Sequence, residues 1–192
     1  MPVIALVIAF ALVAGSAHAE PGSLEQRELE IYSSLINHGL ADAVPIVVLA
    51  AETTGDPAAI AAYEDAAALI EELGVPAETL ANWQRRNAGL FAIDSPLKLD
   101  VSYQMLDAKT RAEIFADVEP AAGWSRFFAR FVGAPGLLRL SRAGFDDNLN
   151  HALVYVEYQC GVDCGSGRLI HLANDSGDTW QVMNAALVWM VD

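Results

Sequence analysis

The sequence predicts an α+β fold in which N-terminal helices pack on a C-terminal antiparallel β-meander. Apolar residues recur with the helical period of about 3.6 through most of residues 23–86. From residue 137 onward, short strand-like segments alternate with clusters of Gly, Asn, Asp and Ser. No repeat, low-complexity tract or linker divides the chain, so we expect one globular domain over residues 20–192.

The N-terminus predicts export. Residues 1–19 carry no charged side chain, and an apolar run from Val3 to Ala14 precedes a small-x-small triplet, Ala17 to Ala19. This order is typical of a signal-peptidase site, and the run is shorter than the ~20 residues of a spanning helix. We therefore expect residues 1–19 to be a cleaved signal peptide and the mature chain to be secreted or periplasmic. Because no Lys or Arg precedes the run, an uncleaved anchor and a buried N-terminal helix stay open as alternatives.

The remainder of the chain is strongly acidic. The 25 Asp and Glu residues and 11 Lys and Arg residues give a formal net charge of −14, and all of them follow residue 19. Such a surface repels nucleic-acid phosphates and anionic lipid headgroups. We therefore expect no nucleic-acid partner, and no membrane partner once the leader is removed.

The first structured segments follow from caps and apolar runs. Ser23, followed three residues later by Gln26, forms a capping box that predicts a helix ending near Gly39. The continuous apolar run Ile46–Ala51 is short and rich in branched residues, which predicts a strand buried on both faces.

Two further helices begin at prolines. Asp56 and Pro57 pair a capping carboxylate with a proline in the first turn, which predicts a helix that ends at Gly74. Pro76 predicts the start of the next helix, on which Trp83 faces inward.

The middle of the chain changes period. Apolar and polar residues alternate over 97–105, which predicts a half-buried strand. Short helices are expected at 107–115 and 123–131, and the aromatic residues of the second are expected to face the core: Trp124, Phe127, Phe128 and Phe131.

The last third predicts the meander, with the helices on one face of its sheet. Strand-like segments are 137–140, 152–158, 168–173 and 180–183, followed by an apolar run at 186–191. Each connection is rich in turn-forming residues.

Cys160 and Cys164 lie in one of these connections. In an oxidising compartment so close a pair indicates a disulfide that fixes a turn between strands. Free thiols, redox chemistry and metal binding are the alternatives, although the spacing is not Cys-x-x-Cys and no second pair completes a zinc site.

A series of motifs in this region carries a resemblance: LSRAGF at 140–145, ALVYV at 152–156, CGVDCGSG at 160–167 and WQV at 180–182. The series resembles a family of bacterial secreted proteins with no established activity. The resemblance implies a shared fold and export, and it carries over no catalytic residue.

Arg142 is the one charged residue singled out as a candidate ligand anchor. The period of two that places Leu138 and Leu140 inward places Arg142 on the same buried side. A buried guanidinium needs a carboxylate or several carbonyls. Arg142 therefore either ties the meander to a helix or loop, or anchors the anionic group of a ligand.

Catalytic chemistry finds little support in the sequence. Ser166 precedes a strand and lacks the Gly-x-Ser-x-Gly elbow of a serine nucleophile. His171 alternates with Ile170 and Leu172, so we expect it on the more exposed sheet face, and no histidine is spaced to pair locally with another. A Ser166–His171–acid site assembled in space remains the basis of an alternative, a cell-envelope hydrolase.

Metal and aromatic sites are weak as well. The acidic loops at 146–150 and 175–178 lack the pattern of an EF-hand and are explained by turn chemistry. Trp124, Trp180 and Trp189 fit core positions. We therefore predict no catalytic, cofactor or metal residues and expect a non-catalytic domain that binds a protein, a peptide or a small ligand. A third hypothesis is an accessory subunit that docks through the apolar run 186–191.

Overall fold

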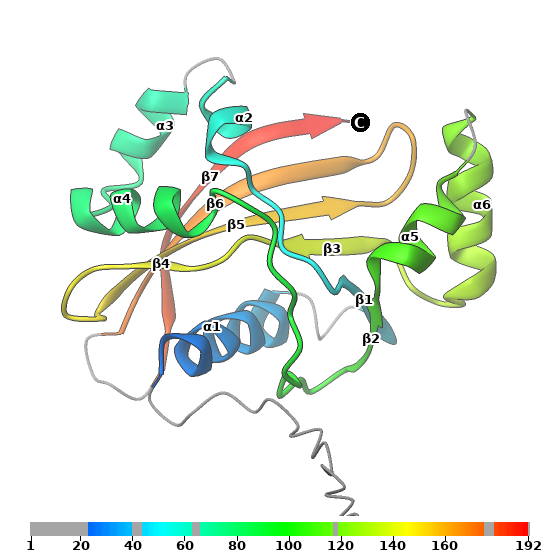
Figure 1. Ribbon diagram of the computed structural model, residues 1–192, viewed down its shortest axis with the longest axis horizontal. Helices are drawn as coiled ribbons and strands as arrows, with labels where there is room; N and C mark the ends of the chain where they lie inside the picture. Colours follow the sequence, from blue (N-terminus) through cyan, green and yellow to red (C-terminus); the bar gives the residue numbers. More distant parts are fainter. Residues whose placement is uncertain (1–22, 40–43, 63–65, 117–118, 175–178, 192) are drawn as a thin grey trace, which may run out of the picture.

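The computed structural model describes residues 23–39, 44–62, 66–116, 119–174 and 179–191 (Figure 1). Within them, seven strands form one mixed sheet in the order β2-β1-β3-β5-β6-β7, with β4 paired to β5, and six helices lie around it. The α+β prediction is confirmed. The predicted signal peptide at residues 1–19 lies outside the described residues.

The helices precede most of the strands in the chain. The helices are α1 (Leu24–Gly39), α2 (Pro57–Ala61), α3 (Ala66–Glu72), α4 (Ala77–Arg86), α5 (Ala108–Ile114) and α6 (Pro120–Arg130). The strands are β1 (Ile46–Ala50), β2 (Ser102–Leu106), β3 (Leu137–Leu140), β4 (Gly144–Phe145), β5 (His151–Gln159), β6 (Gly165–Ala173) and β7 (Gln181–Val191).

Helix starts follow the local signals in the sequence. Ser23 Oγ accepts a hydrogen bond from the Gln26 amide at 3.2 Å, and Asp56 Oδ1 accepts one from the Ala58 amide at 2.9 Å. The helix expected from Pro57 to Gly74 is divided into α2 and α3, and residues 63–65 between them lie outside the described residues.

Strand β1 is the centre of a parallel group. It pairs in parallel with β2 on one side and β3 on the other, whereas β3, β5, β6 and β7 form the predicted antiparallel meander. Val47 and Leu49 pack on one face and Val48 and Ala50 on the other, so the prediction of a strand buried on both faces is confirmed.

The predicted strand segments differ from the structure in four places. The strand expected at 168–173 begins at Gly165, so Ser166 lies in β6 and not before the strand as expected. The half-buried strand begins only at Ser102, although the segment before it packs against the core through Leu97. The two-residue strand β4 was not predicted. The segments expected at 180–183 and 186–191 form one edge strand, β7, which begins just after the buried Trp180.

Helices cover both faces of the sheet, so the expectation of a single covered face was wrong. Helix α1 packs on one face through Ile31 and Ile36. The helices after β1 pack on the other, α4 through Trp83 and α6 through Phe127. The physical reason is that β1 and β5 carry consecutive apolar residues, and a strand of this kind has to be buried on both faces.

The two cysteines lie in the β5–β6 connection. Cys160 and Cys164 form a disulfide with Cα atoms 5.1 Å apart, and the Cys160 amide donates to the Cys164 carbonyl at 2.9 Å. The predicted disulfide across a turn between strands is confirmed. Among the described helices, none combines the length and apolar character needed to cross a membrane.

Candidate functional site

The carboxyl ends of β1 and β3 lie side by side, and the chain leaves them in opposite directions. After β1 it leads to α2 and finally to β2, on one side of β1, whereas after β3 it leads to β4 and β5 on the other side. The Thr54 amide donates to the Leu140 carbonyl at 2.8 Å, which holds the two strand exits together. In sheets with parallel strands, such a switch point is where ligands bind.

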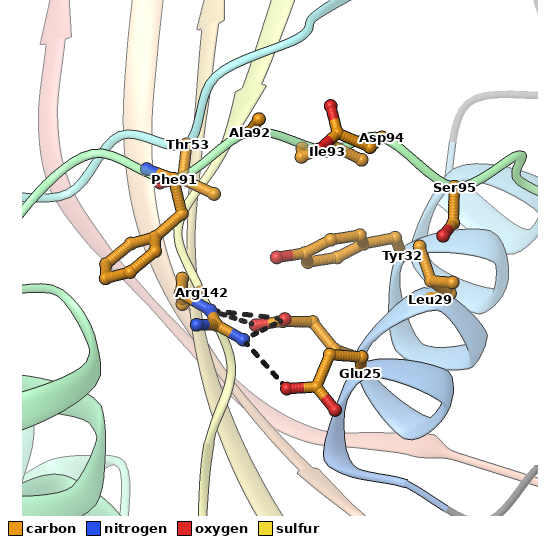
Figure 2. Close-up of a pocket in the computed structure, with 11 residues that line it drawn as sticks. Glu25, Leu29, Tyr32, Thr53, Phe91, Ala92, Ile93, Asp94, Ser95 and Arg142 are labelled. Carbon is orange, nitrogen blue, oxygen red and sulfur yellow. Dashed lines mark hydrogen bonds and ion pairs between the residues drawn. The ribbon is translucent and has the colours of Figure 1, made fainter. Parts of the chain in front are cut away.

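A cavity of about 420 Å³ opens at this point (Figure 2). It lies between α1 and residues 91–95, and the strand exits contribute Thr53 and Arg142 to its wall. We call this cavity the Arg142 pocket. Its volume falls within the range of about 300–1,000 Å³ that is usual for small-molecule sites.

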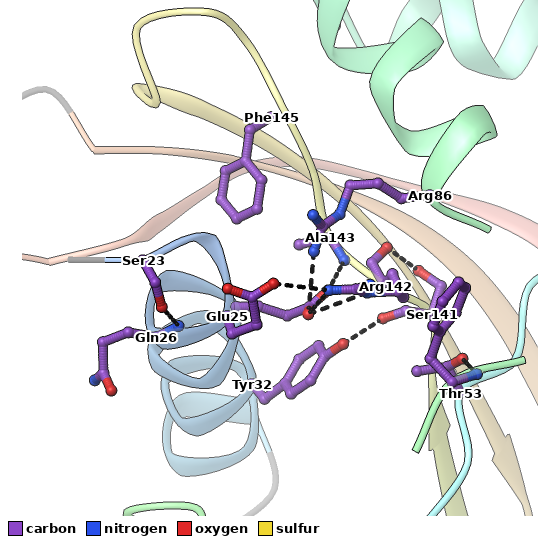
Figure 3. Close-up of polar contacts among 12 residues, drawn as sticks. Ser23, Glu25, Gln26, Tyr32, Thr53, Arg86, Ser141, Arg142, Ala143 and Phe145 are labelled. Carbon is purple, nitrogen blue, oxygen red and sulfur yellow. Dashed lines mark hydrogen bonds and ion pairs between the residues drawn. The ribbon is translucent and has the colours of Figure 1, made fainter. Parts of the chain in front are cut away.

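An ion cluster forms one wall of the Arg142 pocket (Figure 3). The Glu28 side chain is only 9% exposed and pairs with Arg142 Nη2 at 3.0 Å and with Arg86 Nη2 at 3.2 Å. The Ala143 amide donates to the same carboxylate at 2.6 Å. A buried charge is tolerated when it is paired and fully hydrogen-bonded in this way, so Glu28 joins α1 to α4 and to the exit of β3.

Arg142 therefore has the first of its two predicted roles, since it ties the meander to a helix. It faces the same side as Leu138 and Leu140, as expected, although β3 ends before it. Glu28 accounts for the hydrogen bonds of Nε and Nη2, whereas Nη1 makes no hydrogen bond to any described residue. Because the side chain is 16% exposed and lines the cavity, one edge of the guanidinium stays open to a ligand.

The segment that carries Arg142 is fixed from both sides. Ser141 Oγ accepts hydrogen bonds from Trp83 Nε1 at 3.0 Å and from the Tyr155 amide at 2.8 Å. The Asn87 amide group bonds both the N–H and the carbonyl of Arg142, at 2.8 and 3.0 Å. Arg142 is thus held in place before any ligand arrives, which lowers the entropy cost of binding.

Tyr32 supports the same segment from α1. Its hydroxyl donates to the Ser141 carbonyl at 2.8 Å. Burial, and secondarily the negative charge of Glu28, raises the pKa of Tyr32 well above its ordinary value, so the hydroxyl keeps its proton and remains a donor.

The structure separates Ser166 from His171. Ser166 faces α1 and lines a second cavity with Leu35 and Ile170. His171 points to the opposite face of β6, where it is 6% exposed and bonds the Leu73 carbonyl at 3.1 Å. The expectation of an exposed His171 was wrong because the end of α3 covers this face, and the two side chains cannot act together.

His171 has a partner that the sequence did not predict. His151 Nδ1 lies 3.1 Å from His171 Nε2. The β5–β6 register places Leu153 opposite His171, so His151, two residues before Leu153 on the same face of β5, is the diagonal neighbour of His171. With Nδ1–H donated to the Leu73 carbonyl, His171 Nε2 is left as an acceptor for His151. Burial, together with the neighbouring His151, lowers the pKa of His171.

We expect this buried histidine to make stability depend on pH. The unfolded chain binds the proton more readily than the folded chain, so the free energy of unfolding falls as the pH drops below about 6.5. Each unit by which the pKa of His171 is depressed accounts for about 1.4 kcal/mol. Urea unfolding at pH 7.5 and 5.5 measures the loss.

A single variant tests His171. His171→Gln should reduce the difference in the free energy of unfolding between the two pH values. An equal pH dependence in His171→Gln and the unmodified protein would show that His171 is not the group responsible.

The other predicted features agree with turn and core roles. Asp146 Oδ1 accepts from the amides of Asn150 and His151, at 2.7 and 2.8 Å, as a turn residue does. Asp175 and Asp178 lie outside the described residues. Across the described ranges, no group of three or more His, Cys, Asp or Glu side chains is placed to hold a metal ion.

The three tryptophans singled out in the sequence differ in burial. Trp180 is buried beside Phe145, and Trp124 packs on the aromatic cluster of α6. Trp189 donates to the Tyr155 hydroxyl at 2.6 Å. Trp180 thus has the expected core position, whereas Trp124 and Trp189 are half-buried. The expectation that Phe128 faces the core was wrong, since its side chain is 37% exposed.

The Arg142 pocket was only partly predictable. Arg142 was identified from the alternation along β3, but Glu28, Phe91 and Asp94 carried no local signal. No protein-family model, no curated protein and no solved structure matches this chain, so the function is inferred from the geometry of this pocket.

Proposed function

We propose that the protein is exported by its leader and acts as a non-catalytic binding protein that holds a small organic ligand in the Arg142 pocket. The leader pattern at residues 1–19 and the disulfide between Cys160 and Cys164 support export, since disulfides persist in oxidising compartments. The secreted or periplasmic compartment follows from the same two features.

The observation that carries the proposal is the open edge of a preorganised guanidinium at a switch point of the sheet. Arg142 is clamped by Glu28 and by Asn87, yet its side chain lines the cavity and no described residue bonds its Nη1. The Phe91 ring lies against the guanidinium, with its centroid 4.8 Å from Cζ, and is 42% exposed. A charged anchor beside an exposed aromatic ring is a common arrangement for holding a small molecule.

A thermal-shift screen of polar metabolites, followed by calorimetry of the compounds that raise Tm, tests the proposal. Phe91→Ala should weaken binding about tenfold, because it removes the apolar surface against which the ligand packs. Leu90→Ala is the matched control, since Leu90 is the adjacent exposed apolar residue and does not line the cavity.

Two results would contradict the proposal. One is a screen in which no compound raises Tm. The other is a ligand whose affinity falls equally in Phe91→Ala and Leu90→Ala, because that ligand would bind elsewhere.

A further inference from the structure

We infer that the ligand of the Arg142 pocket is a small zwitterion with an apolar body, such as a free α-amino acid. This inference rests on the proposed function and adds the chemical class of the ligand. It follows from three features of the cavity: a fixed guanidinium group, an exposed carboxylate beside it, and an apolar wall opposite.

The cation provides a place for a carboxylate. Glu28 is shared by two guanidinium groups, those of Arg86 and Arg142, and Glu25 pairs loosely with Arg142, so these four side chains balance in charge and favour a ligand without net charge. The Glu28 oxygens already accept the amide of Ala143 as well, whereas no residue in the described part of the chain bonds Arg142 Nη1. The edge of a guanidinium matches the two oxygens of a carboxylate, which makes this edge a site for the anionic end of a ligand.

Glu25 favours a positive charge on the ligand beside its carboxylate. Its Oε1 lies 3.8 Å from Arg142 Nη2, and its side chain is 60% exposed, so this pairing is loose (Figure 2). A ligand with a carboxylate alone would add a third negative group beside the Arg142 guanidinium, next to Glu25 and Glu28, which is unfavourable. An ammonium group on the adjacent ligand atom relieves this repulsion by pairing with Glu25, and Asp94 adds a further negative charge to the cavity wall.

The remaining wall suits an apolar body. Phe91 and Ile93 line one side of the cavity, and Leu29 and the ring of Tyr32 line the other (Figure 2). The ligand would thus present neighbouring opposite charges to Arg142 and Glu25 and an apolar side chain to these residues. An α-amino acid has this arrangement, with the ammonium and carboxylate groups on one carbon atom.

Three matched probes separate the contributions of the two charges. L-leucine carries both, 4-methylpentanoate lacks the ammonium group, and 3-methylbutylamine lacks the carboxylate. Calorimetry on the purified protein should show that L-leucine binds at least about tenfold more tightly than either of the others. The same comparison is repeated with L-phenylalanine, 3-phenylpropanoate and 2-phenylethylamine, in case the cavity prefers a larger body.

Glu25→Gln tests how the ammonium group is recognised. The substitution should weaken the binding of L-leucine about tenfold. The affinity for 4-methylpentanoate should stay the same or increase, because one carboxylate has been removed from beside Arg142. Glu30→Gln is the control, since Glu30 is an exposed acid of the same helix that does not line this cavity. It should change neither affinity.

The outcomes distinguish this inference from the proposed function. Ligands that bind in a Phe91-dependent manner but carry only one charge, or neither, would overturn the inference and leave the proposed function standing. So would tight binding of L-leucine that Glu25→Gln does not weaken. A failure of every compound in the metabolite screen would instead overturn the proposed function, and the inference with it.

Discussion

Glu28→Gln is expected to lower the free energy of unfolding by about 3–5 kcal/mol, the cost of leaving buried charges without their partner. The carboxylate pairs with two guanidinium groups, and the substitution removes it from both Arg86 and Arg142, with the exposed Glu25 as the other described acid paired with Arg142. Urea unfolding measures the loss.

The same cluster predicts an order of effects. Arg142→Met and Arg86→Met should each cost less than Glu28→Gln, because Glu28 keeps the other guanidinium and the amide of Ala143. Glu30→Gln, on the exposed side of the same helix, should change stability by no more than about 0.5 kcal/mol. If Glu28→Gln were as stable as Glu30→Gln, the cluster would not hold α1 to the sheet.

An Arg142→Met variant that folds but no longer binds L-leucine would support the second role predicted for Arg142, that of ligand anchor.

Features that depend on neighbouring residues were predictable from the sequence. The caps at Ser23 and Asp56 are satisfied by amides two or three residues away, and the disulfide closes between two cysteines four residues apart. The buried strand β1 was also found, because its apolar run reports burial on both faces regardless of what covers them.

Features that depend on register were not predictable. Alternation along β3 indicated that Arg142 needs a partner, but that partner, Glu28, lies 114 residues earlier in the chain. The burial of His171 was missed for the same reason, since it is bonded by Leu73, which directly follows α3 and lies 98 residues earlier in the chain. One sequence carries no signal that pairs such distant residues, so the pocket they form could not be assembled in advance.

The Gly144–Phe145 pair was recognisable in the sequence, but the reason for its glycine lies in a distant part of the chain. The Gly-Phe pair within LSRAGF was part of the resemblance, but nothing in the sequence showed why glycine is at position 144. In the structure this pair is β4, which pairs with β5 and packs against α4. A Cβ atom at Gly144 would clash with the Cβ, Cα and N atoms of Trp83. Helix α4 can approach the sheet this closely only over a residue without a side chain.

Gly144→Ala is therefore expected to cost about 3 kcal/mol, at the upper end of the range for overpacking, because the clashing atoms are largely backbone and cannot rotate away. Gly89→Ala is the matched control: nothing lies within 4 Å of a Cβ at that position, so its effect should be small. Urea unfolding of the two variants measures the difference in stability.

A displaced α4 would also disturb the Trp83–Ser141 hydrogen bond and the pairing of Arg86 with Glu28. Gly144→Ala should therefore weaken ligand binding as well, although Gly144 does not line the Arg142 pocket. Equal stability of the two alanine variants would mean that α4 does not pack closely on β4. The contact by which α4 supports the pocket wall, the pairing of Arg86 with Glu28, would then not be explained by this packing.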